Sequence, residues 1–339
     1  QDWARFDRLV QRAGALQGDF PGDAAIALQE MEALTNGVNQ TGEHQDWARF
    51  DRLVQRAGAL QGVFPGDAAI ALEEMKALTN GVSQTGEHQD WERFDRLVQR
   101  AGAPQSAFPG DAAIALQEMQ ALTNGVSDTG KHQDWERFDR LVQRAGALQG
   151  VFPGDAAIAF EEMKALTNGV NQTGEHQDWA RFDRLVQRAG ALQSAFPKDA
   201  AIALVEMQAL TNGATQTGKH QDWERFERIM LRSIQVVQSI TMGPEHFDLF
   251  FKILIGGYVQ IRKHLPKESH ELKDMIGSIL MAEAVLEILV QTDEHSHWGV
   301  AVIADALISS DYLKASDAFE ALLENSKIKL GDIPTLPDA

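Results

Sequence analysis

The sequence predicts an all-α protein, an α-solenoid of stacked helix-turn-helix repeats with a C-terminal helical cap. Three observations lead to this prediction. The chain repeats itself with a fixed period of 44 residues, and periods of about 20–50 residues are typical of solenoids and arrays. Within each copy, apolar residues recur three and four positions apart, which places them on one face of a helix. The residue alternation that indicates a β-strand does not occur in the copies.

The repeat is marked by the tripeptide Gln-Asp-Trp, which begins at residues 1, 45, 89, 133, 177 and 221. Five nearly identical copies fill residues 1–220, and a sixth begins at Gln221 and diverges after Glu227. The second and fourth copies share details that differ in the third and fifth, which indicates that a pair of copies was itself duplicated. Agreement between copies is therefore weak evidence of functional constraint, whereas differences mark positions that the fold tolerates.

The second copy illustrates the two helices expected in each repeat. We expect the first helix to begin near Thr41 and to end before the Phe64-Pro65 step, because a residue that precedes proline avoids the helical region. The proline then suits the first turn of the second helix. We expect this helix to end at Asn80-Gly81, a residue pair that tolerates positive φ.

A single copy is too small to bury its apolar residues. One hairpin leaves an apolar side exposed to water, so the stability of the array should come from the interfaces between copies. Trp3, Phe6 and their equivalents fall on the same helical stripe as Leu9 and Val10. We therefore expect both aromatic residues of each copy to lie in the core.

The C-terminal part, residues 221–339, differs in composition. The sixth copy replaces polar positions of its first helix with Ile229, Met230, Leu231, Ile234, Val236 and Val237. A helix that is apolar most of the way round is expected to be buried on both sides. Further helices are expected at about 244–265, 268–292, 297–309 and 311–326, and we interpret this part as a cap on the stack. The N-terminal copy has no such cap, which predicts either a longer natural chain or end-to-end association.

Charge and composition restrict the function. The chain has 31 Lys and Arg residues against 49 Asp and Glu residues, a net charge of −18. Because the phosphate backbone attracts positive charge, this balance argues against nucleic acid or an anionic membrane as a partner. Cysteine is absent, which excludes disulfides, thiolate metal sites and a cysteine nucleophile. No signal peptide and no apolar run of about 20 residues is visible, so we expect a cytoplasmic or secreted protein.

Several short motifs resemble the tetratricopeptide repeat. They are Gly18-Asp19-Phe20, Ala24, Ala25, Ile26, Ala33-Leu34 and, near the C-terminus, Asp311-Tyr312, Ala315 and Ala321-Leu322. The period of 44 departs from the 34 of that family, and the closing proline is missing; periods near 44 also occur in HEAT and armadillo arrays. The chain thus resembles the tetratricopeptide-like superhelical class. The resemblance implies a scaffold that binds a protein or peptide.

Arginines form one candidate binding surface. They occupy positions 5, 8 and 12 of each copy, so they share a helix face and are expected to form a ridge along the stack. The fifteen residues are Arg5, Arg8, Arg12, Arg49, Arg52, Arg56, Arg93, Arg96, Arg100, Arg137, Arg140, Arg144, Arg181, Arg184 and Arg188. Guanidinium groups suit carboxylates and phosphates, so the ridge predicts an acidic peptide or phosphate ligand. The alternative is a solvated face neutralised by the equivalents of Asp2, Asp7 and Glu43.

Positions 29 and 32 form a second candidate surface, because they vary between copies and share a helix face. Their residues are Gln29, Glu32, Glu73, Lys76, Gln117, Gln120, Glu161, Lys164, Val205 and Gln208. If this face is the concave side of the solenoid, the variation predicts a surface that distinguishes partners. The alternative is unconstrained drift on an outer face.

Histidines occur once per copy, at His44 and its equivalents. Neighbouring helices lie about 10 Å apart, whereas zinc–nitrogen bonds are about 2 Å long, so we interpret these histidines as helix-start residues. His295 and His297 form a separate pair in the cap that could bind a metal. No further ligand follows from the spacing.

Three hypotheses for function follow. The first, which we favour, is a non-enzymatic scaffold that binds a protein or peptide along the solenoid and needs no cofactor. The second is a reader of single-stranded RNA with one helical repeat per base, which the acidic balance disfavours. The third is an enzyme or metal site in the cap, with the array as a recruiting arm. The chain contains no recognisable catalytic motif, and we expect a monomer that binds no membrane.

Overall fold

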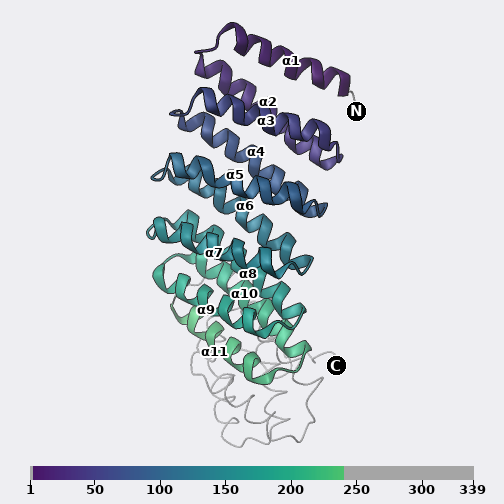
Figure 1. Cartoon of the computed structure of the whole chain (residues 1–339). Helices are drawn as coiled ribbons and strands as arrows, with labels where there is room; N and C mark the ends of the chain where they lie inside the picture. Colours follow the sequence, from purple (N-terminus) through teal and green to yellow (C-terminus); the bar gives the residue numbers. More distant parts are fainter. Residues whose placement is uncertain (1–2, 240–339) are drawn as a thin grey trace, which may run out of the picture. The chain divides into compact units, whose positions relative to one another are not determined.

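The computed structural model describes residues 3–239, which form eleven α-helices and no strand (Figure 1). The helices are α1 (Trp3–Asp19), α2 (Ala24–Glu43), α3 (Trp47–Val63), α4 (Ala68–Glu87), α5 (Trp91–Ala107), α6 (Ala112–Lys131), α7 (Trp135–Val151), α8 (Ala156–Glu175), α9 (Trp179–Ala195), α10 (Ala200–Lys219) and α11 (Trp223–Ser239). The predicted all-α solenoid of helix-turn-helix repeats is confirmed for these residues. The helices expected between 244 and 326, and the pair His295 and His297, lie outside the described residues.

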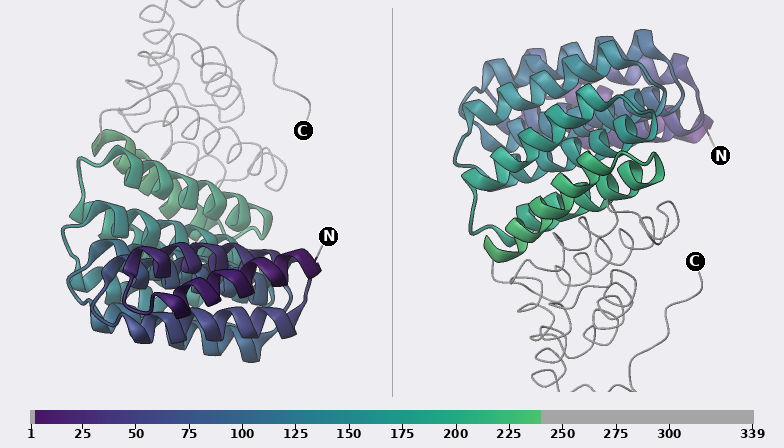
Figure 2. Two further views of the ribbon diagram at one scale, coloured as in Figure 1. Left: turned by 90° about the horizontal axis from the view of Figure 1, so that it is seen from above. Right: turned by 90° about the horizontal axis from the view of Figure 1, so that it is seen from below.

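The chain divides into two compact units, Gln1–Asn168 and Gly169–Ala339, with the boundary inside α8. The first unit contains α1–α7 and the beginning of α8. Its helices run side by side in sequence order (Figure 1, Figure 2). The described part of the second unit contains the rest of α8 and α9–α11.

The turn inside each copy ends the first helix as predicted. In the second copy α3 ends at Val63, and Phe64 follows with a non-helical backbone. Asp67 then caps α4, since its side chain accepts hydrogen bonds from the backbone N–H groups of Ala69 (2.9 Å) and Ile70 (3.1 Å). The prediction that Pro65 lies in the first turn was wrong. The extended backbone of Asp67 takes the N-cap position, so the proline lies in the turn before it.

The turn between copies lies later than the sequence predicted. Each second helix runs through the Asn-Gly pair, and α2 ends only at Glu43. The next helix therefore begins at Trp47 instead of near Thr41, after an N-cap at Asp46. His44 is the C-cap of α2 and not a helix-start residue. Both predictions were wrong because the residue in the left-handed conformation after the helix is glutamine instead of glycine.

This helix stop is a Schellman motif that places glutamine in the left-handed region. The N–H of Gln45 donates to the carbonyl of Gly42 (2.9 Å), and the N–H of Asp46 donates to that of Thr41 (2.9 Å). Gln45 and its four equivalents have φ between 56° and 59°. Glycine usually occupies this position, because the left-handed region costs other residues about 1–2 kcal/mol. The residue type thus gave no signal that a helix ends here.

The strongest helix contacts cross the boundaries between copies. Within the first unit, α4 packs more extensively against α5 of the next copy than against α3 of its own copy. In the same way, α2 packs more extensively against α3 than against α1, and α6 packs more extensively against α7 than against α5. The second helices α2, α4 and α6 also pack directly on one another, whereas consecutive first helices have few direct contacts. The expectation that interfaces between copies hold the array together agrees with this packing.

Glycine makes the close packing of the second helices possible. A Cβ atom on Gly125 of α6 would lie 2.9 Å from Phe94 Cζ and 3.0 Å from Leu141 Cδ1. Those two side chains belong to the first helices on either side and are buried. The Asn-Gly pair is therefore part of the helix, and its glycine admits core side chains instead of ending the helix.

The core also differs from the prediction at the tryptophans. Phe50 and its equivalents in the later copies are fully buried, as expected, whereas Phe6 of the first copy is half-buried. Trp47 and its equivalents are only half-buried. Edge-on contacts with both a phenylalanine and a histidine are made by Trp3, Trp47, Trp91 and Trp179. They lie near the first-helix termini, where no second helix covers them completely. The expectation of a core position is correct for the phenylalanines of the later copies and wrong for Phe6 and the tryptophans.

The first helix of the sixth copy, α11, is largely buried where its sequence departs from the repeat. Ile229, Met230, Ile234 and Val236 are buried, but Leu231 remains exposed. Four of the substituted positions are thus buried. Among the helices of residues 3–239, none has both the length and the apolar character needed to cross a bilayer.

Two glycine substitutions test the packing at the Asn-Gly pair. We expect Gly125→Ala to lower the stability of the array by about 1–3 kcal/mol, because overpacking forces buried side chains to move. Gly62→Ala is the matched control, since space is open at Gly62 in α3 and alanine is the better helix former. We expect this control to leave the melting temperature unchanged or to raise it. Equal effects of the two substitutions in thermal melts would contradict the packing described here.

Candidate functional site

The arginines at position 5 connect consecutive copies. Arg49 donates to Asp7 of the preceding copy through Nε (3.0 Å) and also pairs with Asp46 at its own N-cap. Its guanidinium lies 5.3 Å from the ring centroid of Trp3. The hydrogen bond to Asp7, followed by that to Asp46, raises the pKa of Arg49, and the same bond lowers the pKa of Asp7.

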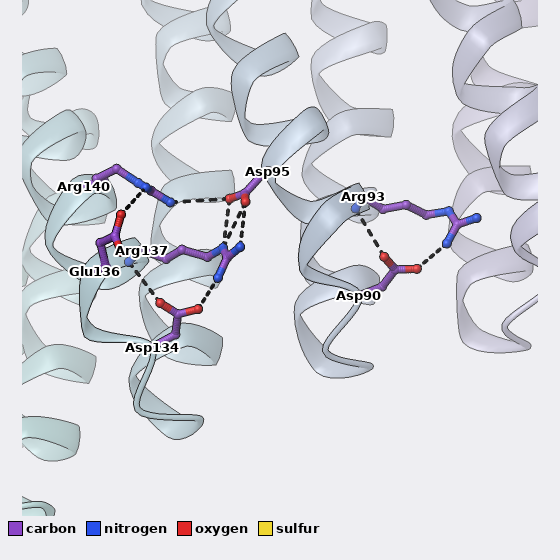
Figure 3. A network of polar contacts seen from close by, with 7 residues as sticks. All are labelled: Asp90, Arg93, Asp95, Asp134, Glu136, Arg137 and Arg140. Carbon is purple, nitrogen blue, oxygen red and sulfur yellow. Dashed lines mark hydrogen bonds and ion pairs between the residues drawn. The ribbon is translucent and has the colours of Figure 1, made fainter.

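The same arrangement recurs along the array. Arg137 pairs with Asp95 and Asp134, and Arg93 pairs with Asp90 (Figure 3). Arg93 also pairs with Asp51, and Arg225 pairs with Asp183 and Asp222. Arg181 pairs with its own N-cap residue, Asp178. Arg5 occupies this position on α1. Arginines at position 5 thus hold adjacent first helices together.

The arginines at position 12 bind buried glutamates. Arg56 donates to both oxygens of Glu30 (2.6 and 2.8 Å), a residue of the preceding second helix. The equivalent pairs are Arg100 with Glu74, Arg144 with Glu118 and, in the second unit, Arg232 with Glu206. These glutamate side chains are 1–5% exposed. Burial raises the pKa of Glu118 and Glu206, and the arginines oppose that shift.

The arginines at position 8 present their guanidinium groups mainly to solvent. Arg96, Arg140 and Arg228 have side chains 56% exposed, and each pairs with a glutamate four residues earlier on its own helix. Arg52 is also exposed, but alanine stands four residues before it. Arg8 and Arg12 lie on α1, and Arg184 and Arg188 lie on α9. The predicted neutralisation by Asp7 is confirmed, although the pairing runs between helices.

Shallow grooves separate consecutive first helices in the first unit. The groove between α5 and α7 has a volume of about 710 Å³ and is lined by Val98, Gly102, Ser106, Arg137, Arg140 and Arg144 among others. The groove between α3 and α5 measures about 270 Å³. The arginines that line both grooves already pair with carboxylates. The predicted cationic ridge is therefore a row of ion pairs that contributes mainly to stacking.

The second candidate surface is the outer stripe of the second helices. Positions 29 and 32 share this stripe as predicted: Gln29 donates to Glu32 (3.2 Å), Lys76 pairs with Glu73, and Lys164 donates to Glu161 (2.9 Å). Accessibility at position 29 changes along the chain. Gln29 is exposed and Glu73 and Gln117 are half-buried, but Glu161 and Val205 are buried.

Because Glu161 and Val205 are buried, their side chains cannot act as surface residues that recognise a partner. At position 32 every residue is exposed or half-buried. These residues are Glu32, Lys76, Gln120, Lys164 and Gln208. Position 32 thus remains accessible throughout, whereas position 29 does so only in the first three copies.

Sequence reasoning missed the asparagines of the Asn-Gly pairs. They are Asn36, Asn80, Asn124, Asn168 and Asn212, and each lies inside a second helix with its side chain exposed or half-buried. Among residues 3–239, none of the five side chains makes a hydrogen bond to the protein. Asparagine is a poor helix former. Its presence in five helix interiors was the available signal, but the pair was interpreted as a helix stop.

Asp128 is a copy-specific difference on the same stripe. The other four copies have glutamine at this position. The Asp128 carboxylate lies against Gly86 of the preceding second helix. Burial raises its pKa to about 6, and nearby Glu87 adds to that shift while Lys131 opposes it.

Comparison with known proteins identifies no relative: no protein-family model and no curated protein matches the chain. The tetratricopeptide-like resemblance thus stays a prediction. Within the part of the chain that the structure describes, no group of three or more histidines and carboxylates is arranged to hold a metal ion.

Removing one partner of a buried ion pair should destabilise the array. We expect Arg100→Met to cost about 3–5 kcal/mol, because it leaves the Glu74 carboxylate buried without its partner. The double variant Arg100→Met with Glu74→Met should recover most of that loss. Arg96→Met is the exposed control and should cost less than about 1 kcal/mol. Urea unfolding measures all three, and equal effects at Arg100 and Arg96 would show that the buried pair does not contribute to stacking.

Asp128 should make stability depend on pH. Its folded-state pKa of about 6 lies above the ordinary value of 3.8, so between pH 4 and 6 the unfolded chain loses this proton first. Stability therefore falls as pH rises through this range and stays lower above pH 6. We expect Asp128→Gln, which restores the residue of the other copies, to remove this component and to raise the melting temperature at pH 7. A difference between the two proteins that is constant from pH 4 to 7 would contradict the shifted pKa.

Proposed function

We propose that the chain is a non-enzymatic interaction scaffold that binds a peptide or protein segment along the outer stripe of its second helices. The observation that carries this proposal is the contrast between the two candidate surfaces. Arginines of the first helices are engaged in ion pairs, most of them between copies. On the stripe of the second helices, the amides of Asn36 and its equivalents instead make no hydrogen bond within residues 3–239, and they lie next to side chains that differ from copy to copy.

This division of roles suits a repeat scaffold. The buried residues of the copies are nearly identical, so each copy has the same packed core. Position 32 is accessible in every copy and carries glutamate, lysine or glutamine. A partner segment that runs across neighbouring second helices would therefore meet a side chain that changes from one copy to the next. The same features suit the tetratricopeptide-like class, in which we place the chain by proposal.

The other hypotheses receive less support. An RNA reader needs positive charge that can neutralise phosphates, but the guanidinium groups at positions 5 and 12 already pair with carboxylates. The hypothesis of an enzyme or metal site in the cap concerns residues outside the described range. We therefore propose no cofactor and no catalytic role for the array.

Peptide selection with matched surface variants tests the proposal. Peptides are selected from a random library on the immobilised full chain, and their affinities are then measured by calorimetry. We expect Lys76→Glu with Lys164→Glu, on the second helices, to change these affinities markedly. Arg52→Glu with Arg96→Glu reverses the same number of charges on the first helices and should have little effect. The proposal is wrong if no peptide binds, or if only the first-helix variant alters binding.

A further inference from the structure

We propose that Asn36, Asn80 and Asn124 form a row of amides that binds the main chain of an extended, neutral or basic polypeptide, with one asparagine for about every three residues. This inference rests on the proposed function and specifies its binding mode. A carboxamide offers two N–H donors and one carbonyl acceptor, which match the carbonyl and N–H groups of a peptide backbone.

The packing of the second helices sets the spacing of this row. Thr35 of α2 donates its hydroxyl to the backbone carbonyl of Glu73 in α4 (3.2 Å), and Thr79 of α4 donates to that of Gln117 in α6 (3.1 Å). These bonds require direct contact between neighbouring second helices. Helices in such contact lie about 8–10 Å apart. Because the three asparagines occupy the same repeat position, they are offset from one another by about this distance.

That spacing matches a polypeptide in the polyproline II conformation. Such a segment advances about 3.1 Å per residue with three residues per turn, so equivalent backbone groups recur about every 9 Å on one side. It has no internal hydrogen bonds, which leaves its backbone groups available to a partner. A helical partner is a poorer match, because its backbone groups are already paired within the helix.

The asparagine side chains have no structural explanation within the described residues. They make no hydrogen bond to residues 3–239, and alanine would be a better helix former at each position. Gly37 and its equivalents supply the close packing next to them, so packing does not require asparagine at the preceding position. Residues that lower the stability of a helix without adding packing contacts or hydrogen bonds are typical of binding surfaces.

Charges beside the row define the partner further. In the first unit, Glu32, Glu43 and Glu87 are exposed on the outer stripe, and Lys76 is paired with Glu73. Carboxylates thus outnumber lysines around Asn36 and Asn80. Electrostatic complementarity therefore favours a partner with lysine or arginine between its backbone contacts and disfavours an acidic one.

Fluorescence polarisation with defined peptides tests this binding mode. The probe is a labelled nonapeptide of three Pro-Pro-Lys triplets, and a nonapeptide of three Pro-Pro-Glu triplets has the same conformation but opposite charge. We expect the full chain to bind the lysine peptide and to bind the glutamate peptide at least about tenfold more weakly. The variant Asn36→Ala with Asn80→Ala and Asn124→Ala should lose at least about tenfold in affinity, because it removes three amide contacts to the peptide backbone at once.

Thermal melting separates a binding role from a structural one. We expect the triple asparagine variant to melt at the same or a higher temperature, since alanine favours the helix. A lower melting temperature would assign the asparagines to the fold and overturn the inference. Absence of binding to the lysine peptide, or equal binding by the variant, would overturn it as well. If peptides from the library still bind the second helices in that case, the binding mode fails while the proposed function stands.

Discussion

The close contact between each second helix and the first helices on either side is the constraint on which the rest of the array depends. In α4, Gly81 lies against Phe50 of its own copy and Leu97 of the next. A side chain at this position would push both first helices away. The contact aligns the threonines that hydrogen-bond to the neighbouring second helix, and it turns the opposite side of α4 toward solvent. One residue position thus controls both the core and the accessible stripe.

Stacking also determines what the charged residues can do. Positive charge on the first helices is abundant in the sequence, but the structure pairs Arg49 with the preceding copy and encloses the carboxylate that binds Arg56. An arginine whose partner is buried contributes to holding copies in register, because separation would leave a carboxylate without its counter-charge. The accessible surface proposed for a partner lies on the second helices, where asparagine amides stand among glutamate and lysine side chains.

Near-identity of the copies gives this surface its regularity. Because the same Asn-Gly pair stands in every second helix, its glycine faces the core each time and its asparagine faces outward each time. A single dipeptide therefore supports both the packing and the proposed row of amides. Residues that differ between copies, such as Lys76 in the second copy and Asp128 in the third, then change the side chains at the surface without changing how the helices pack.

The sequence by itself determined the helical class, the period of 44 and the turn at Phe64-Pro65, because apolar spacing and proline act through local geometry. It also predicted correctly that positions 29 and 32 share a face. Only the tertiary structure decided that the helix continues through Asn80-Gly81 and ends with Gln89 in the left-handed region. That outcome depends on packing between copies, which favours the long helix over the local preference of each residue. The pairing of the arginines and the exposure of the asparagines were decided in the same way, since both depend on which helices become neighbours.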